Sequence, residues 1–379
     1  MKVLLVSKTL AEFPEEAGKA LEISKLGVEL SVIVPVRWRG RPVEAHRLKS
    51  EAYELLTHNC WFSDRESRRL RYHLHFYSGI SRVIGSSRWD LVHIDEEPMN
   101  FATYHALHGC RKKERRAVFT TWQNLMKRYP PPFEFFEKYI FENAAGGFAG
   151  NREAAEILRR RGFAKPVACV PQHGVDPTLF RKLDESDLRG KMAFKDAFVI
   201  GFVGQVAQRK GLDTLIKALA LLPKECILVV VGSGPDAPRF KSLARELGIP
   251  ARLRWEHWVD QREIAKYMCA FDVFVLPSRT LPGWKEQFGR VLIEAMACET
   301  PVVGSDSGEI PNVIGDAGLI FPEGDERELA GRLLRLINDS SLRKSLGGRG
   351  RQRVLERFTY ARVAAQTVDF YKRICSGSE

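Results

Sequence analysis

The sequence lacks the features of secreted, membrane-spanning and zinc-binding proteins. Its seven cysteines are scattered and odd in number, and none forms a C-x-x-C pair, so neither a disulfide framework nor a zinc site is indicated. No apolar run approaches the roughly 18 residues that a membrane-spanning helix needs. The N-terminus has no basic segment before a long apolar stretch, as a secretory signal would have. We therefore expect a cytoplasmic protein.

Motifs of several other enzyme classes are incomplete or missing. Gly232-Ser233-Gly234 begins a G-x-G-x-x-G pattern, but Ala237 stands where the third glycine belongs, which argues against a dinucleotide-binding oxidoreductase. No G-x-x-x-x-G-K-[ST] occurs, so a P-loop kinase or ATPase is not supported. No D-x-D occurs either, and the acidic triplet at 95–97 lacks that spacing, so we predict no metal site.

The chain is globular in composition and carries a surplus of positive charge. Its 379 residues are more than one hydrophobic core usually serves, which predicts two domains. Hydrophobic residues make up 44% and charged residues 28%, so intrinsic disorder is excluded as the main state. Lysine and arginine number 59 against 47 aspartates and glutamates, and the net charge of +12 favours an anionic partner. No nucleic-acid recognition motif accompanies this charge, so we expect no nucleic acid partner.

Short apolar runs alternate with helical patterns from end to end, as in parallel sheets with crossover helices. Strands are predicted at 2–7, 28–35, 89–94, 117–121, 147–150 and 166–171, and then at 198–203, 226–231, 252–255, 272–276, 301–303 and 318–321. Helices are predicted at 15–26, 211–222, 237–247, 261–270 and 290–298, with two more over about 325–356. The fold class is therefore α/β, with two doubly wound parallel sheets.

Two segments depart from this alternation. Within 48–84, one helical face holds Leu70, Leu74, Tyr77 and Ile84, which predicts helical packing on the first sheet. The charged stretch 180–195 has no strong period and is the best linker candidate.

The loop after the predicted strand 198–203 is suited to phosphate. Gly204 lets the chain turn and a ligand approach the backbone. Arg209 and Lys210 come just before a predicted helix, where two cations and free backbone N–H groups make a phosphate site. A solvated basic pair beside a turn is the alternative.

A second motif contains two glutamates separated by seven residues. Glu286 falls in the loop after the predicted strand 272–276, and Glu294 falls on the next helix. A carboxylate there can accept two hydrogen bonds from vicinal hydroxyls of a ribose or hexose, and Gly289 frees backbone N–H groups. Two surface glutamates near a helix start are the alternative.

These motifs resemble the nucleotide-sugar-binding domain of GT-B fold glycosyltransferases, specifically the retaining glycosyltransferase family 4 (glycosyl transferases group 1). The matching strings are GFVGQVAQRKGLDTLIKAL (201–219), VVVGSGP (229–235), FDVFVLPS (271–278), EQFGRVLIEAMACETPVVGSDSGEIPNVI (286–314) and GLIFPEGD (318–325). The resemblance implies two Rossmann-like domains that face each other across a cleft. Residues 1–183, with a C-terminal helix at about 360–379, would bind the acceptor, and residues 190–358 would bind the donor.

The resemblance also implies the reaction and the donor site. Such an enzyme transfers a sugar, with retention, from a nucleoside diphosphate sugar to a glycan or lipid-linked acceptor, and it needs no metal or other cofactor. Arg209 and Lys210 would hold the diphosphate and stabilise the leaving group, Glu294 would bind the ribose, and Glu286 would face the transferred sugar. The donor-binding residues implied are Gly204, Arg209, Lys210, Trp258, Glu286, Phe288, Gly289, Val291 and Glu294.

The resemblance is looser in the first half. The segments 91–98 and 118–124 look like the family's acceptor-side strands and loops, which implies roles for His93, Glu96, Glu97 and Asn124. Gln123 stands where the family usually has a histidine, and a glutamine can bind a hydroxyl but cannot act as a general acid or base. The front-side transfer attributed to the family is assisted by the leaving phosphate, and activity therefore does not require the histidine. Gln123 remains a catalytic candidate.

Departures from the family pattern keep other functions open. The histidine is missing, and the loop at 8–14 lacks the glycine pair that family members often carry after the first strand. A nucleotide-sugar-binding pseudo-transferase or scaffold subunit is one alternative. Another GT-B enzyme, such as a nucleotide-sugar epimerase, is the second.

The densest basic stretches lie in the first half, at 37–41, 65–71 and 111–116. Arginines beside Trp38, Trp61, Phe62 and Tyr72 predict an anionic membrane surface as a partner of the first domain. Such a surface would bring the domain to a lipid-linked acceptor. A soluble basic face is the alternative.

Overall fold

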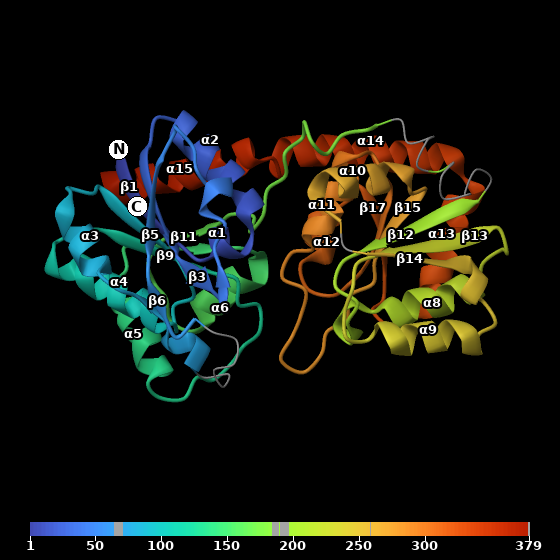
Figure 1. Ribbon diagram of the computed structural model, residues 1–379, viewed down its shortest axis with the longest axis horizontal. Coiled ribbons are helices and arrows are strands. Elements are labelled where there is room, and N and C mark those ends of the chain that lie inside the picture. Colours follow the sequence, from blue (N-terminus) through green and yellow to red (C-terminus); the bar gives the residue numbers. More distant parts are fainter. Residues whose placement is uncertain (64–70, 184–188, 190–196, 258, 378–379) are drawn as a thin grey trace. The chain divides into compact units, whose positions relative to one another are not determined.

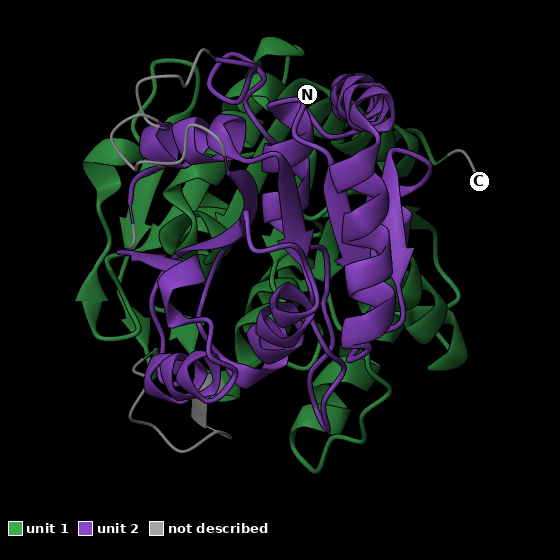
Figure 2. Cartoon of the chain, turned by 90° about the vertical axis from the view of Figure 1, so that its right-hand side faces the viewer, with its two compact units in different colours: residues 1–174, 360–379 green, residues 175–359 purple. Residues whose placement is uncertain are grey.

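The structure is a computed structural model that describes residues 1–377 except for 64–70, 184–188, 190–196 and 258 (Figure 1). The chain divides into two compact units (Figure 2). Unit 1 comprises Met1–Gly174 and Tyr360–Glu379, and unit 2 comprises Val175–Thr359. Most of the predicted linker, 180–195, lies outside the described residues.

Unit 1 is an α/β domain. Its described strands are β1 (Lys2–Ser7), β2 (Glu29–Pro35), β3 (Arg37–Trp38), β4 (Arg41–Pro42), β5 (Glu54–His58), β6 (Cys60–Trp61), β7 (Phe76–Tyr77), β8 (Leu91–Asp95), β9 (Ala117–Thr121), β10 (Gly146–Ala149) and β11 (Val167–Cys169). Its described helices are α1 (Thr9–Glu12), α2 (Ala17–Lys25), α3 (Ile80–Ser86), α4 (Phe101–Lys112), α5 (Phe133–Asn143), α6 (Arg152–Arg160) and α15 (Tyr360–Ser376). Short 3-10 turns are η1 (Pro14–Glu16), η2 (Ala45–Arg47) and η3 (Arg71–Leu74).

Among the described residues, the main sheet of unit 1 has seven strands in the order β11-β10-β9-β8-β1-β2-β5. All neighbouring strands in it are parallel. The strand order reverses between β1 and β8, so the loops that follow these two strands run to opposite sides of the sheet. In doubly wound sheets, ligands bind at this switch point, outside the carboxyl ends of the strands.

Both faces of this sheet are buried, which explains its nearly continuous apolar strands. In β1, Val3 and Leu5 point to the face covered by α2 and α15, while Leu4 and Val6 belong to the opposite core with α3 and α4. Alternate residues of a strand point to opposite faces, so a strand covered on both sides needs apolar residues at every position.

The helical prediction for 48–84 is wrong for most of the described part of that segment. β5 forms the edge of the sheet, pairing in parallel with β2, and β6 pairs with β7 as an antiparallel ribbon. α3 begins only after Gly79, which has a left-handed φ of 75°. The apolar residues that indicated one helix therefore belong to different short elements. Tyr77 and Ile84 share one core, Leu74 packs against another, and Leu70 lies outside the described residues.

Unit 2 repeats the architecture. Its described strands are β12 (Phe198–Val203), β13 (Cys226–Val231), β14 (Leu253–Glu256), β15 (Val273–Leu276), β16 (Val302–Ser305) and β17 (Gly318–Phe321). Its described helices are α8 (Leu212–Ala220), α9 (Ala237–Glu246), α10 (Gln261–Ala270), α11 (Arg290–Ala297), α12 (Ile310–Ile314), α13 (Glu326–Asn338) and α14 (Ser340–Arg357), with 3-10 turns η4 (Gln208–Lys210) and η5 (Pro250–Arg252).

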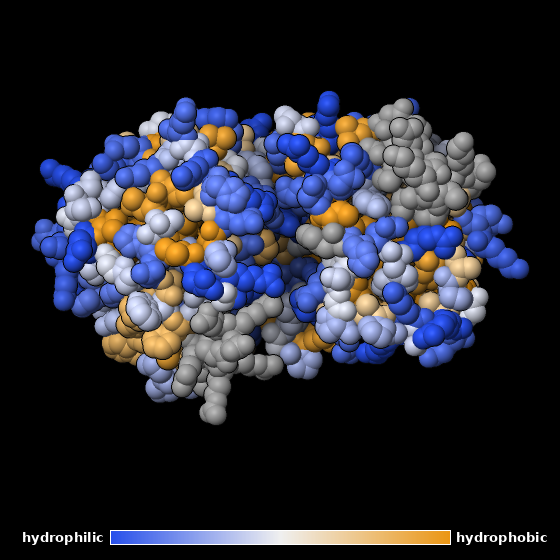
Figure 3. Space-filling model, viewed as in Figure 1, coloured by the Kyte–Doolittle hydropathy of each residue, from blue (hydrophilic) through white to orange (hydrophobic). Residues whose placement is uncertain are grey.

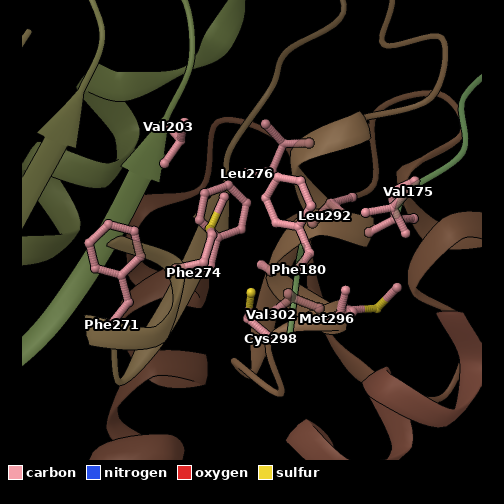
Figure 4. Close-up of a cluster of buried hydrophobic side chains, with 14 of the residues drawn as sticks. Val175, Phe180, Val203, Phe271, Phe274, Leu276, Leu292, Met296, Cys298 and Val302 are labelled. Atoms are coloured by element: carbon pink, nitrogen blue, oxygen red, sulfur yellow. The ribbon is translucent and has the colours of Figure 1, made fainter. Parts of the chain in front are cut away.

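The described sheet of unit 2 has the order β14-β13-β12-β15-β16-β17, and all of its neighbouring strands are parallel. This is the strand order of a Rossmann fold, with its switch point between β12 and β15. A buried cluster fixes α11 on this sheet and includes Leu276 of β15 with Leu292 and Met296 of α11 (Figure 4). The predicted fold class, α/β with two doubly wound parallel sheets, is confirmed.

No helix in the described part of the chain is both long enough and apolar enough to cross a bilayer.

A buried ion pair joins the two strands at the switch point of unit 1. Lys8 follows β1 and Glu96 follows β8, and their Nζ and Oε2 atoms lie 2.7 Å apart with both side chains almost fully buried. His75 and Asn100 add hydrogen bonds to the same carboxylate, each 3.1 Å long. Burial alone would raise the pKa of Glu96, but Lys8 and His75 outweigh it and lower the pKa to about 2.

Replacing Lys8 by methionine should destabilise the fold, because the Glu96 carboxylate would stay buried without its cation. We expect Lys8→Met to lower the free energy of unfolding by roughly 3–5 kcal/mol at pH 7, measured by urea denaturation. The lowered pKa of Glu96 stabilises the native protein above the ordinary value of 4.5, and this stabilisation is lost as the pH falls toward 2. The difference between wild type and variant should therefore shrink at pH 3.

Lys25→Met is the matched control, because Lys25 on α2 makes only an exposed ion pair with Glu22, and such pairs contribute little. A Lys8→Met variant as stable as the control would contradict the role of the buried pair.

Candidate active site

The loops that follow β12 and β15 meet at the switch point of unit 2. The backbone N–H of Arg279 donates to the carbonyl of Arg209, 2.9 Å away, which links the two loops directly. Gly211 has a left-handed φ of 67°, and a Cβ added there would lie 1.8 Å from the carbonyl oxygen of Pro277. Only glycine allows the two loops to approach this closely.

The first of these loops places two cations before α8. Gly204 turns the chain directly after β12 with a φ of 147°, and the turn η4 then carries Arg209 and Lys210. Asp236 anchors the loop by accepting a hydrogen bond of 2.7 Å from the backbone N–H of Gln208. The predicted phosphate-binding residues are thus held in one short segment at the beginning of a helix, where the backbone dipole favours an anion.

Lys210 reaches from this loop to Glu286 in the other one. The Nζ of Lys210 lies 2.6 Å from Oε2 of Glu286, and the Ser278 hydroxyl donates to the same oxygen at 2.8 Å. Burial alone would raise the pKa of Glu286, but Lys210, the Ser278 hydrogen bond and the charge of Arg209 outweigh it, so the pKa is lowered. Glu286 is therefore an ionised carboxylate in a largely buried position.

The backbone of Glu286 is fixed as well. Its carbonyl accepts a hydrogen bond of 3.2 Å from the N–H of Glu309. Gly308, with a φ of 58°, lies so close that an added Cβ would be 2.0 Å from that carbonyl oxygen. Glu286 is therefore held by contacts of both its main chain and its side chain. A group that must meet a ligand in one orientation requires such restraint.

The remaining predicted donor residues lie on or near α11. Gly289 precedes the helix with a φ of 83°, and the buried Glu294 is paired with Arg290, whose Nε is 3.2 Å from its Oε1. Phe288 is buried in the core and Val291 packs against that core, so only their backbone groups are available to a ligand. Trp258 lies outside the described residues.

This arrangement can bind an anion beside a group that binds hydroxyls. The ammonium of Lys210 has three hydrogens to donate, and Glu286 takes one of them. The Nε of Arg209 is buried and has no hydrogen-bond partner among the described residues. No cluster of three or more metal-ligating side chains occurs in the described ranges.

In unit 1, the predicted acceptor-side residues His93 and Glu96 are occupied by contacts within the protein. His93 lies buried in β8, with Nδ1 2.6 Å from the Tyr371 hydroxyl and Nε2 2.7 Å from the Thr120 hydroxyl. Burial, helped by the charge of Lys19, holds its pKa well below the ordinary value, so the ring is neutral. Glu96 belongs to the buried ion pair described above.

The other predicted residues of unit 1 hold the loop after β9 in place. Glu97 accepts hydrogen bonds from the Thr121 hydroxyl, at 2.5 Å, and from the backbone N–H of Trp122, at 2.9 Å. The Gln123 amide donates to the Tyr129 hydroxyl at 3.3 Å and accepts from a backbone N–H in the same loop. Asn124 is buried.

A pocket in unit 1 was not predicted from the sequence. It opens beside the carboxyl ends of β1 and β8, has a cavity volume of about 50 Å³, and includes Lys19, Asp95 and Gln172 in its lining. Burial raises the pKa of Asp95 and lowers that of Lys19, and Oε1 of Gln172 is buried without a hydrogen-bond partner among the described residues. The acidic triplet at 95–97 was a signal for Asp95, whereas nothing in the sequence distinguishes Lys19.

Known proteins are similar to this chain in sequence, mainly over unit 2, and in fold. Residues 184–353 match the family described as Glycosyl transferases group 1. A D-inositol 3-phosphate glycosyltransferase from Streptomyces bingchenggensis is 32% identical over 241 residues, which cover 59% of this chain and 52% of that protein. The chain spans about half to two thirds of the length of the first curated relatives that it matches.

Two solved structures show the fold. A sucrose-phosphate synthase from Thermosynechococcus elongatus superposes with a TM-score of 0.77 at 21% identity, over 100% of both chains. Anabaena HepE, solved in complex with UDP, gives a TM-score of 0.76 at 19% identity, over 98% of this chain and 100% of that one. The predicted GT-B architecture of two Rossmann-like domains is thereby confirmed. The sequence match to the glycosyl transferases group 1 family thus covers residues 184–353, the part of the chain that contains both donor-site motifs.

Proposed function

We propose that the chain is a glycosyltransferase that takes its sugar from a nucleoside diphosphate sugar. The observation that carries the proposal is the contact between Lys210 and the buried, ionised Glu286, with Arg209 beside them. Cations suit a diphosphate, and a fixed carboxylate suits sugar hydroxyls. HepE, a structural neighbour, has been solved with UDP and with UDP-glucose, which supports a nucleotide sugar as the ligand.

The proposed mechanism is a retaining, front-side transfer without a metal ion. As the bond between the sugar and the diphosphate breaks, negative charge grows on the leaving oxygen, and Arg209 with Lys210 stabilises it. The acceptor hydroxyl attacks from the same face and passes its proton to the leaving phosphate oxygen. No basic side chain is needed for this step, which agrees with Gln123 at the position of the family histidine.

The carboxylates orient the donor in this proposal. Glu286 accepts hydrogen bonds from hydroxyls of the transferred sugar, and Glu294, behind the glycine turn at Gly289, accepts them from the ribose. We assign the acceptor, a glycan or lipid-linked glycan, to unit 1, where the pocket of about 50 Å³ beside Lys19 and Asp95 has room for one polar group of the acceptor and not for a whole sugar. The amine of Lys19 and the carboxyl of Asp95 can each hydrogen-bond a hydroxyl in either protonation state.

Removing the two cations should weaken binding of the diphosphate and leave binding of the nucleoside unchanged. Calorimetry with uridine and guanosine diphosphates would first identify the base. For the double variant Arg209→Ala/Lys210→Ala, we expect the affinity for that diphosphate to fall roughly 100-fold, because two charge-assisted contacts are lost. Lys217→Ala, on the helix α8 that follows the two cations, is the matched control. Unchanged diphosphate affinity in the double variant would refute the phosphate site.

We also propose that unit 1 binds an anionic membrane surface through exposed aromatic residues. Trp61 and Phe62 are 57% and 54% exposed, and Phe135 on α5 is 55% exposed. Ring contacts through Phe76, Phe101 and Tyr104 connect Phe62 to Phe135. Figure 3 shows hydrophobic surface over α5.

The aromatic prediction needs one correction. Trp38 is buried and packs edge-on against His75, so it cannot take part in such a surface. Its strand β3 turns the indole into the protein instead of outward. Tyr72 was also predicted, but its side chain lies outside the described residues.

Vesicle co-sedimentation tests the membrane proposal. We expect wild type to bind phosphatidylglycerol vesicles at low salt, to be released by high salt, and to bind phosphatidylcholine vesicles weakly. Trp61→Ser/Phe135→Ser should bind roughly tenfold more weakly, because apolar area is lost from the contact. Leu221→Ser removes a similarly exposed residue of unit 2 and should behave as wild type. Equal binding to both vesicle types would exclude the membrane role.

A further inference from the structure

Trp284 lies in the second loop of the donor site, the one after β15, in a tight turn that precedes Glu286. Leu281 and Trp284 exchange two backbone hydrogen bonds of 2.9 and 3.0 Å, and Pro282 and Gly283 form the tip of the turn. Gly283 has a φ of 83°, the conformation that a type II turn requires after proline. The turn therefore fixes the indole at one place, two residues before the carboxylate.

The indole contacts both cations of the site. The guanidinium carbon of Arg209 and the ammonium of Lys210 each lie 5.2 Å from the centre of the Trp284 ring. Both distances are within the range of a cation–π interaction, for which tryptophan is the most effective partner. One aromatic side chain thus holds two cations that belong to the opposite loop.

These contacts matter because lysine and arginine are flexible. Each of these side chains loses rotamer freedom when it is held in one position, and a ligand that has to order both binds more weakly. Arg209 is held by its hydrogen bond to Gln205 and by the indole, while Lys210 is held by Glu286 and the indole. The site is therefore ordered before any anion arrives.

We propose that Trp284 is a positioning residue for the donor diphosphate. Its ring face holds Arg209 and Lys210 in the arrangement that receives the two phosphates, and it leaves their hydrogen-bond donors available to phosphate oxygens. The inference rests on the proposed function. It extends the donor site to a residue that lies outside both the Arg209/Lys210 motif and the Glu286/Glu294 motif. Trp284 acts through the cations and does not itself bind the phosphates.

A role in packing alone would have different consequences. If the indole only filled space, any large apolar side chain would replace it, and its loss would have the same effect whether or not Lys210 is present. If the ring face holds the cations, an aromatic replacement should preserve binding, and the effect of removing the ring should depend on Lys210.

The experiment measures calorimetric affinities for the matching nucleoside diphosphate and nucleoside. We expect Trp284→Leu to bind the diphosphate roughly tenfold more weakly and the nucleoside as wild type does, while Trp284→Phe stays within roughly threefold. In a Lys210→Met background, Trp284→Leu should lower the diphosphate affinity by a clearly smaller factor than it does in wild type. Leu281→Val changes the other side chain of the same turn and serves as the control for turn disruption.

Four results would overturn the inference. Full diphosphate affinity in Trp284→Leu would show that the ring is not needed. Equal losses of affinity in Trp284→Leu and Trp284→Phe would indicate packing alone. So would a loss on Trp284→Leu that is as large in the Lys210→Met background as in wild type. Trp284→Phe also allows the comparison if Trp284→Leu does not fold, because a loss beyond tenfold in a folded Trp284→Phe would contradict the role of the ring face. Failure of wild type to bind any nucleoside diphosphate would instead refute the proposed function, and this inference with it.

Discussion

The ion pair between Lys210 and Glu286 is the interaction on which the candidate donor site depends. It joins two loops whose sequences are 76 residues apart, one before α8 and one before α11. Around it, neighbouring backbones come so close that only glycine fits at Gly211, in the first of these loops, and at Gly308, in the loop after β16. The strand order of unit 2 places β12 and β15 side by side. The loops that follow them are therefore neighbours, and the Lys210 ammonium meets the Glu286 carboxylate. The positions of Arg209 and Trp284 follow from the same contact between loops.

Unit 1 contains the same kind of pair at the equivalent place, with a different consequence. Lys8 and Glu96 follow the two strands at its switch point, as Lys210 and Glu286 do in unit 2, but their side chains are only 7% and 0% exposed. The side chain of Lys210 is 19% exposed, so a ligand can reach it. The two pairs therefore differ in their exposure. The buried pair of unit 1 can only stabilise the fold, which makes Glu96 a structural residue, whereas the partly exposed pair of unit 2 can also contact a ligand, so Glu286 remains a candidate for catalysis.

The sequence predicted regular elements well and contacts between loops poorly. Strands at 2–7, 117–121, 198–203, 226–231 and 318–321 coincide with the observed ones, because strands buried on both faces are continuous apolar runs. The segment 48–84 misled because apolar residues of several short elements fall at helical spacing. In unit 2, the motifs indicated Arg209, Lys210, Glu286 and Glu294 as candidates for a donor site, since each motif lies within a few residues. The cation contacts of Trp284, the pairing of Lys8 with Glu96 and the pocket around Lys19 join distant parts of the chain, and no local pattern indicates them.

The central claim is that an ionised, immobilised Glu286 orients a nucleotide sugar for transfer. The most direct test is to measure release of nucleoside diphosphate from candidate nucleotide sugars, with pooled acceptors, by wild type and by Glu286→Gln. The account predicts that wild type releases the diphosphate and that Glu286→Gln does so roughly 100-fold more slowly, while its diphosphate affinity stays at or above that of wild type, because Lys210 loses its anionic partner. Release at the wild-type rate by Glu286→Gln would contradict the role of this carboxylate. Binding of donors by wild type without any release would contradict the transferase itself and favour a nucleotide-sugar-binding scaffold.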